Sequence, residues 1–149
     1  MSYSMWSVDG RGICVHSLKK VTVDGVFRLL EKAPKTKAKV LGYLKDCNVK
    51  QADATMEDIA NMEDSCGYMG IGTILRDVIE EAEDVLLDVC EDCDCKQYLL
   101  FTPFYPWSNV SDAKRSMTKE RLDEIFEEYV GLLTDEYIEV CEYSVPNCG

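Results

Sequence analysis

The chain has 149 residues, of which 46% are hydrophobic and 30% charged, and its formal net charge is −12. This length and composition predict a single folded domain over residues 1–149 and exclude an intrinsically disordered chain. The charge is unevenly divided, because residues 1–50 sum to +6 and residues 51–149 to −18. An acidic surface of this size would repel free nucleic acid and anionic membranes, so we expect a cationic partner: a basic protein, a metal ion or a cationic ligand.

The sequence shows no sign of membrane insertion or secretion. No apolar run approaches the roughly 20 residues that cross a bilayer. Residues 1–6 lack the basic start and apolar core of a signal peptide. We therefore expect a cytoplasmic protein, bacterial or in a host cell, whose eight cysteines are reduced thiols.

The first half of the sequence predicts one strand followed by helices. Residues 2–8 favour a short strand that ends at a turn over Asp9–Gly12. Thr22 is placed to cap a helix whose apolar residues recur at three- and four-residue spacing. Pro34 ends that helix and opens the next one at its first position. Thr55 begins a further helix with a weak capping box.

The second half predicts a longer helix, a hairpin, another helix and a last strand. An apolar stripe over Ile71–Leu86 marks the longer helix, and residues 85–90 and 97–102 are expected to be strands joined by an acidic turn. Thr118 is placed to cap the next helix, and the last strand is expected over 137–143. The elements follow the βαββαβ order of the ferredoxin-like fold, with an enlarged first helical crossover. We therefore expect an α+β protein whose antiparallel sheet carries helices on one face.

Three cysteines alternate with acidic residues in the predicted hairpin, at Cys90, Cys93 and Cys95. Thiolates are good ligands for zinc or copper(I), so these are the candidate metal ligands, with zinc as the candidate ion. A closed zinc site needs four ligands, and the sequence shows no second cysteine or histidine pair at matching spacing. The alternative is a solvated turn with partly packed cysteines. Because neighbouring carboxylates raise the pKa of a thiol, redox catalysis is not expected here.

No complete catalytic set is present in the sequence. His16 is the single histidine, so every Ser-His-Asp or Cys-His arrangement would have to include it. The glycines at 67, 70 and 72 match neither phosphate-binding spacing and are expected to form a tight turn. We therefore expect a protein that is not an enzyme and has no bound cofactor. A metal- or thiol-dependent small enzyme centred on Cys90–Cys95 is the alternative.

Two features of the sequence indicate a protein interface. Acidic residues on the outer faces of two predicted helices and in the hairpin turn could form one negative surface that resembles a phosphate backbone. The segment Phe101–Trp107 holds four aromatic residues and two prolines, and it is either a lid over the sheet or an exposed anchor. The lysines of the first third also suggest head-to-tail pairing with the acidic half of another copy. The predicted partner-binding residues are Glu80, Glu81, Asp84, Glu91, Asp92, Asp94, Phe104, Tyr105, Trp107, Glu124, Glu127 and Glu128.

Four segments of the second half carry a resemblance: Gln97–Pro103, Tyr105–Trp107, Asp123–Phe126 and Tyr143–Val145. In these segments the chain resembles small uncharacterised proteins carried by prophages and mobile elements of Gram-positive gut bacteria. The resemblance implies an accessory role such as counter-defence, like that of small acidic anti-CRISPR proteins. The expected function is therefore a phage-derived inhibitor that occupies a basic, nucleic-acid-binding groove of a host protein such as a CRISPR nuclease. A soluble housekeeping subunit is the remaining alternative.

Overall fold

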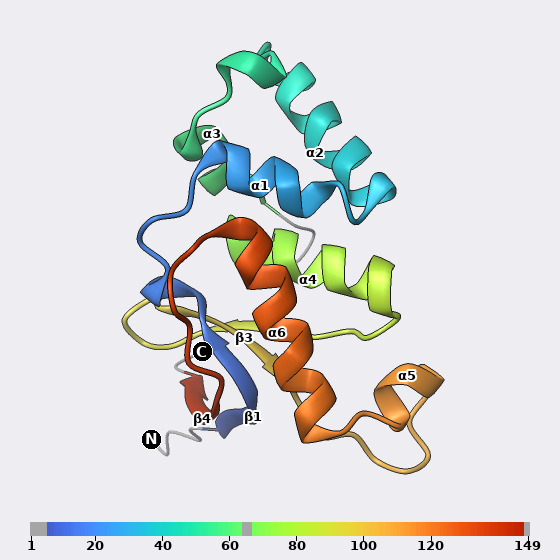
Figure 1. The fold of residues 1–149 in the computed structure, drawn as a ribbon. Coiled ribbons are helices and arrows are strands. Elements are labelled where there is room, and N and C mark those ends of the chain that lie inside the picture. The colour runs from blue at the N-terminus through green and yellow to red at the C-terminus, as the bar shows by residue number, and fades with distance from the viewer. Residues whose placement is uncertain (1–5, 64–66, 148–149) are drawn as a thin grey trace.

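In the computed structural model, residues 6–63 and 67–147 are described, and they form an α+β fold around one four-stranded sheet (Figure 1). The strands cross the sheet in the order β2-β3-β1-β4, and every neighbouring pair is antiparallel. The predicted α+β class with an antiparallel sheet is confirmed. The strands are β1 (Trp6–Cys14), β2 (Asp88–Glu91), β3 (Gln97–Phe101) and β4 (Cys141–Asn147).

The helices lie in two groups along the chain. Between β1 and β2 come η1 (Val15–Ser17), α1 (Val23–Leu30), α2 (Pro34–Asp46), η2 (Gln51–Asp53), α3 (Met56–Ala60) and α4 (Ile71–Glu83). Between β3 and β4 come α5 (Asp112–Arg115) and α6 (Lys119–Leu133). The first crossover is enlarged, as predicted, while the ferredoxin-like assignment as a whole stays a prediction. No helix in the described segments is long and apolar enough to cross a membrane.

The helices stack in layers on one side of the sheet. α4 and α6 pack against the strands, and α1 packs against α6 and α4, with α2 beyond them (Figure 1). The basic first third of the chain therefore builds most of the layer that lies farthest from the sheet. The acidic remainder supplies β2 to β4, α4 and α6.

Local signals in the sequence set where the helices begin. Thr22, Thr55 and Thr118 each accept a hydrogen bond from the backbone N–H three residues later, and the capping box of α3 is complete. Before α4, Gly67 and Gly70 have φ of 89° and 83°, which glycine adopts without steric cost. These predicted helix starts are confirmed, and so is the turn at Gly67 and Gly70. Gly72, predicted in the same turn, lies in α4 instead.

β1 continues to Cys14, past the predicted end at Val8, and lies in the middle of the sheet. Residues 2–5 of the predicted strand lie outside the described residues. The predicted turn at Asp9–Gly12 is wrong, since the strand continues through it and pairs with β3 on one side and β4 on the other. A Cβ atom on Gly12 would lie 1.9 Å from the carbonyl oxygen of Leu99. Glycine at this position therefore allows the backbone of β3 to approach closely. A glycine inside a strand can mark such a close approach as well as a turn.

Two further strand boundaries differ from the prediction. β2 begins at Asp88 and β4 at Cys141, later than expected in both cases. Leu86, predicted on the apolar stripe of α4, is 46% exposed. The reason is that Asp84 adopts a left-handed conformation, with φ of 56°, and ends the helix before Leu86 is reached.

The two faces of the sheet carry different clusters of side chains. Because side chains alternate along a strand, Leu99 joins the main core under α4 and α6, while Leu100 points to the other face. The rings of Tyr98 and Tyr143 meet on that other face with their centroids 5.1 Å apart. The smaller cluster comprises Cys90, Leu100 and Val145, with Val8, Tyr98 and Tyr143 packed against it.

Candidate functional site

The loop after β3 divides its aromatic side chains between the interior and the solvent. Phe104 is half-buried, and its ring lies edge-to-face with that of Phe101 at 6.4 Å between centroids. Tyr105 and Trp107 are 66% and 80% exposed. The segment therefore combines the two predicted alternatives, a lid over the sheet and an exposed anchor. Its first two aromatic residues pack inward, and its last two face solvent.

Tyr105 and Trp107 stack on each other, with 5° between the ring planes and 4.9 Å between the centroids. The backbone N–H of Ser108 donates to the carbonyl of Tyr105 at 2.9 Å, and Ser108 Oγ accepts from the N–H of Tyr105 at 3.2 Å. Arg115 of α5 donates to the carbonyls of Pro106 and Ser108 at 2.9 and 2.6 Å. The two rings are thus held in place while exposed, so a partner that covered them would order few additional side chains.

A groove of about 220 Å³ lies beside this loop, between the end of α4 and α5. The predicted residues Glu80 and Asp84 line it together with the exposed Leu86. Ser111, which caps α5, donates its hydroxyl hydrogen to the carbonyl of Asp84 and ties the two helices together. Lys114 is 7% exposed and donates to the carbonyl of Leu86 at 3.0 Å. We call the exposed set the aromatic–acidic edge: Glu80, Asp84, Leu86, Tyr105 and Trp107.

Glu81, although predicted to bind a partner, is engaged within the fold. Its carboxylate accepts backbone N–H bonds from Lys35 at 3.0 Å and Thr36 at 2.8 Å, at the start of α2. Ala33 precedes α2 and has no side chain that can cap it, so Glu81 of α4 provides the cap. Burial acts to raise the pKa of Glu81, but these hydrogen bonds outweigh burial and the pKa is lowered.

The acidic hairpin turn is likewise organised by its own backbone. The Asp92 carboxylate accepts N–H bonds from Asp94 at 2.8 Å and Lys96 at 3.0 Å. The bond from Lys96 is the main cause of the lowered pKa of Asp92. The hairpin lies against the start of α4, since Gln97 Nε2 donates to the carbonyl of Met69 at 3.0 Å.

The predicted acidic residues lie on three elements of the fold: the end of α4, the hairpin between β2 and β3, and α6. The hairpin adjoins the first turn of α4, whereas Glu80 and Asp84 lie toward its far end. At 1.5 Å per residue they are about 14 and about 20 Å from Ile71 along the helix. The acidic residues of α6 occupy its exposed face. The structure therefore brings Glu80 and Asp84 next to residues 109–111 of the loop after β3. Arg121 bridges Glu83, at the same end of α4, and Glu124 of α6. The hairpin residues Glu91, Asp92 and Asp94 lie apart, and Glu127 and Glu128 lie farther along the exposed face of α6.

The three candidate metal-binding cysteines do not converge. Cys90 is 6% exposed on β2, Cys95 is an exposed turn residue with φ of 62°, and Cys93 is disulfide-bonded. Among the residues that the structure describes, no three Cys, His, Asp or Glu side chains are placed to share a metal ion. Burial, followed by the charges of Asp88 and Asp92, raises the pKa of Cys90 to about 11 and opposes thiolate formation. The expectation of reduced thiols is wrong for Cys93.

His16 offers no catalytic pair among the described residues. It is exposed in η1, and its Nε2 lies 3.4 Å from Lys19 Nζ.

Sequence reasoning also missed α5, which holds the aromatic loop through the hydrogen bonds of Arg115. A signal for α5 was present, because Ser111 is a good helix cap and two basic residues follow at the helix end.

Comparisons with protein-family models, with curated proteins and with solved structures find no match for this chain. The resemblance to prophage accessory proteins therefore stays a prediction. The residues and contacts of the chain itself are the basis for proposing a function.

Proposed function

We propose that this chain is a non-enzymatic protein-interaction module that binds a basic partner at the aromatic–acidic edge. The main support is the exposed, stacked pair formed by Tyr105 and Trp107, whose loop Arg115 holds through the carbonyls of Pro106 and Ser108. Tyrosine and tryptophan are enriched among the residues that dominate binding energy at interfaces. Each offers a large contact area with few rotatable bonds, so covering the pair would release apolar surface from water at little entropic cost.

The net charge of the chain, −12, favours a cationic partner. Glu80 and Asp84 line the adjoining groove together with the buried Lys114. Such a surface accelerates association with a basic protein, and the attraction weakens as salt is added. The finer proposal is a phage-derived inhibitor that occupies the basic groove of a nucleic-acid-binding protein such as a CRISPR nuclease. Net charge, chain length and the sequence resemblance support that finer proposal.

The proposal is tested by selecting peptides from a random phage-displayed library against the immobilised chain and measuring the affinity of each selected peptide. We expect the peptides to carry lysine or arginine close to an apolar residue. Trp107→Ala and Tyr105→Ala should each weaken their binding by about tenfold or more, as expected when an aromatic hot spot is truncated. The melting temperature should stay unchanged, because both side chains are exposed.

Tyr137→Ala is the matched control. Tyr137 is 90% exposed and follows the end of α6 that lies away from α5, so its loss should leave peptide affinity unchanged. Raising salt from about 0.05 M to about 0.3 M should weaken binding to the unchanged chain. The proposal would be contradicted if the peptides bound the Trp107→Ala variant as tightly as the unchanged chain. It would also be contradicted if their affinity did not change with salt concentration.

A further inference from the structure

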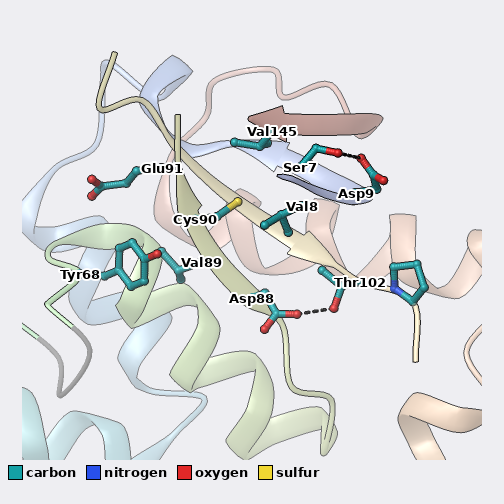
Figure 2. A pocket seen from close by; sticks show the side chains of 11 residues that line it. Ser7, Val8, Asp9, Tyr68, Asp88, Val89, Cys90, Glu91, Thr102 and Val145 are labelled. Carbon is teal, nitrogen blue, oxygen red and sulfur yellow. Dashed lines mark hydrogen bonds between the residues drawn. The ribbon is translucent and has the colours of Figure 1, made fainter. Parts of the chain in front are cut away.

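A cavity of about 510 Å³ opens beside β2, and it shares no lining residue with the groove of the aromatic–acidic edge. Side chains from β1, β2 and β4, from the segment after β3, and from Tyr68 before α4 line it (Figure 2). Cavities of about 300–1,000 Å³ are typical of small-molecule sites.

The floor of this cavity is apolar and includes a buried thiol. Figure 2 shows the sulfur of Cys90 pointing toward Val8, with Val145 close to Val8 on the neighbouring strand. Cys90 is 6% exposed, and within the described part of the chain its sulfur is a free thiol with no hydrogen-bond partner. A ligand in the cavity would therefore meet aliphatic carbon and a weakly polar sulfur at its base.

The cavity is also lined by carboxylates. Asp9, Asp88 and Glu91 line the cavity, and no lysine, arginine or histidine does so among the described lining residues. The Thr102 hydroxyl donates to Oδ2 of Asp88, which orients that carboxylate and leaves Oδ1 without a partner in the described residues (Figure 2). The Ser7 hydroxyl donates to Oδ1 of Asp9 at 3.1 Å.

The negative potential of this region acts on the buried thiol. Burial is the main reason that the pKa of Cys90 is raised, and the charge of Asp88 is the next. The cavity thus offers an apolar floor and oriented negative charge, without a compensating cation among the described lining residues.

We propose that this cavity binds an aliphatic diamine or polyamine, with ammonium groups on Asp88 and Asp9 and methylene groups on Val8, Cys90 and Val145. The alternation of cationic and apolar segments in such a ligand matches the alternation of carboxylate and apolar side chains in the lining. A metal ion would leave the apolar floor unused, and a neutral apolar ligand would bury carboxylates without a partner. This site is separate from the one proposed for a protein partner.

The probe is spermidine, measured by equilibrium dialysis at about 0.15 M salt, where general attraction to an acidic chain is screened. We expect a dissociation constant below about 1 mM. Asp88→Asn should weaken binding by about tenfold, because it removes a charge-assisted hydrogen bond. Asp9→Asn should weaken it less, and because Asp9 is exposed this variant keeps the test valid if Asp88→Asn fails to fold.

Glu127→Gln is the matched control, since Glu127 is an exposed carboxylate on α6 outside the cavity. It should bind spermidine like the unchanged chain, and so should Trp107→Ala, which separates this test from that of the protein interface. 1-Pentanol and Mg²⁺ should not displace spermidine. Equal affinity in the Asp88→Asn, Asp9→Asn and Glu127→Gln variants, or full displacement by Mg²⁺, would overturn the proposal and leave only attraction to net charge.

Discussion

Cys90 and Cys95 are neighbours in one hairpin, yet their surroundings give them opposite reactivity. Cys90 lies on β2 with 6% of its surface exposed, and its pKa is raised to about 11 by burial and by the nearby carboxylates. Cys95 is exposed in the turn, where a reagent can reach it. The nucleophile is the thiolate, so Cys90, the first residue of the candidate metal segment, is the less reactive of the two.

Alkylation with iodoacetamide at pH 8, without reductant, should therefore label Cys95 and the exposed Cys47 well before Cys90. A thiol of pKa about 11 holds about a hundredfold less thiolate at this pH than one of ordinary pKa, and burial slows the reaction further. Peptide mass spectrometry over time gives the order of labelling. Cys90 reacting as fast as Cys95 would contradict this prediction and would favour the thiol-enzyme alternative.

The glycines inside helices differ in whether another element touches them. A Cβ atom on Gly25 of α1 would lie 2.0 Å from the carbonyl oxygen of Leu133, at the end of α6. A Cβ atom on Gly42 of α2 would meet nothing within 4 Å. Gly25 therefore permits the close packing of α1 on α6, whereas Gly42 only weakens its own helix.

The two alanine variants should change stability in opposite directions. Gly25→Ala should lower the free energy of unfolding by about 1–3 kcal/mol, because α1 and α6 must move apart. Gly42→Ala should raise it by about 0.5–1 kcal/mol, because alanine restricts the unfolded chain and suits a helix. Urea unfolding of each variant gives both values. A stabilising Gly25→Ala would show that α1 does not approach α6 as closely as described.

Most of the helices were predictable from sequence because their signals are local, although α5 was missed. Thr22, Thr55 and Thr118 each act within one turn of the chain, so the sequence around them is sufficient. The role of Gly12 was not predictable, because what requires glycine there is the backbone of β3, far along the chain. For the same reason Glu81 was predicted at a partner surface, although it caps a helix from another segment.

At the scale of the whole molecule, single carboxylates connect distant segments. Arg11 of β1 pairs with Asp123 of α6, with Nε and Oδ1 2.7 Å apart. Glu136, which follows α6, accepts the backbone N–H groups of Lys19 and Lys20. The hydrogen bond from Arg11 lowers the pKa of Asp123, and that from the Lys19 backbone lowers the pKa of Glu136. Both contacts therefore favour the ionised carboxylate.

These lowered pKa values give stability a defined dependence on pH. A carboxyl whose pKa is lower in the folded state stabilises the fold above its unfolded pKa, about 4, and loses that effect as pH falls through the folded value. Asp123→Asn should therefore lower the free energy of unfolding by about 1–2 kcal/mol at pH 7 and by much less at pH 2. Urea unfolding at the two pH values measures the difference. An equal loss of unfolding free energy at the two pH values would mean that the charge of Asp123 does not contribute to its contact with Arg11.

The central place of β1 determines when the sheet can be completed during synthesis. β1 is bordered by β3 on one side and by β4 on the other, and its register with β4 joins Trp6 to Asn147. During synthesis the middle of the sheet thus emerges from the ribosome first, and its second neighbour is translated more than a hundred residues later. Until then one edge of β1 has no strand to bond, so nascent chains halted before β4 would expose an open hydrogen-bonding edge of the kind that recruits chaperones or other chains.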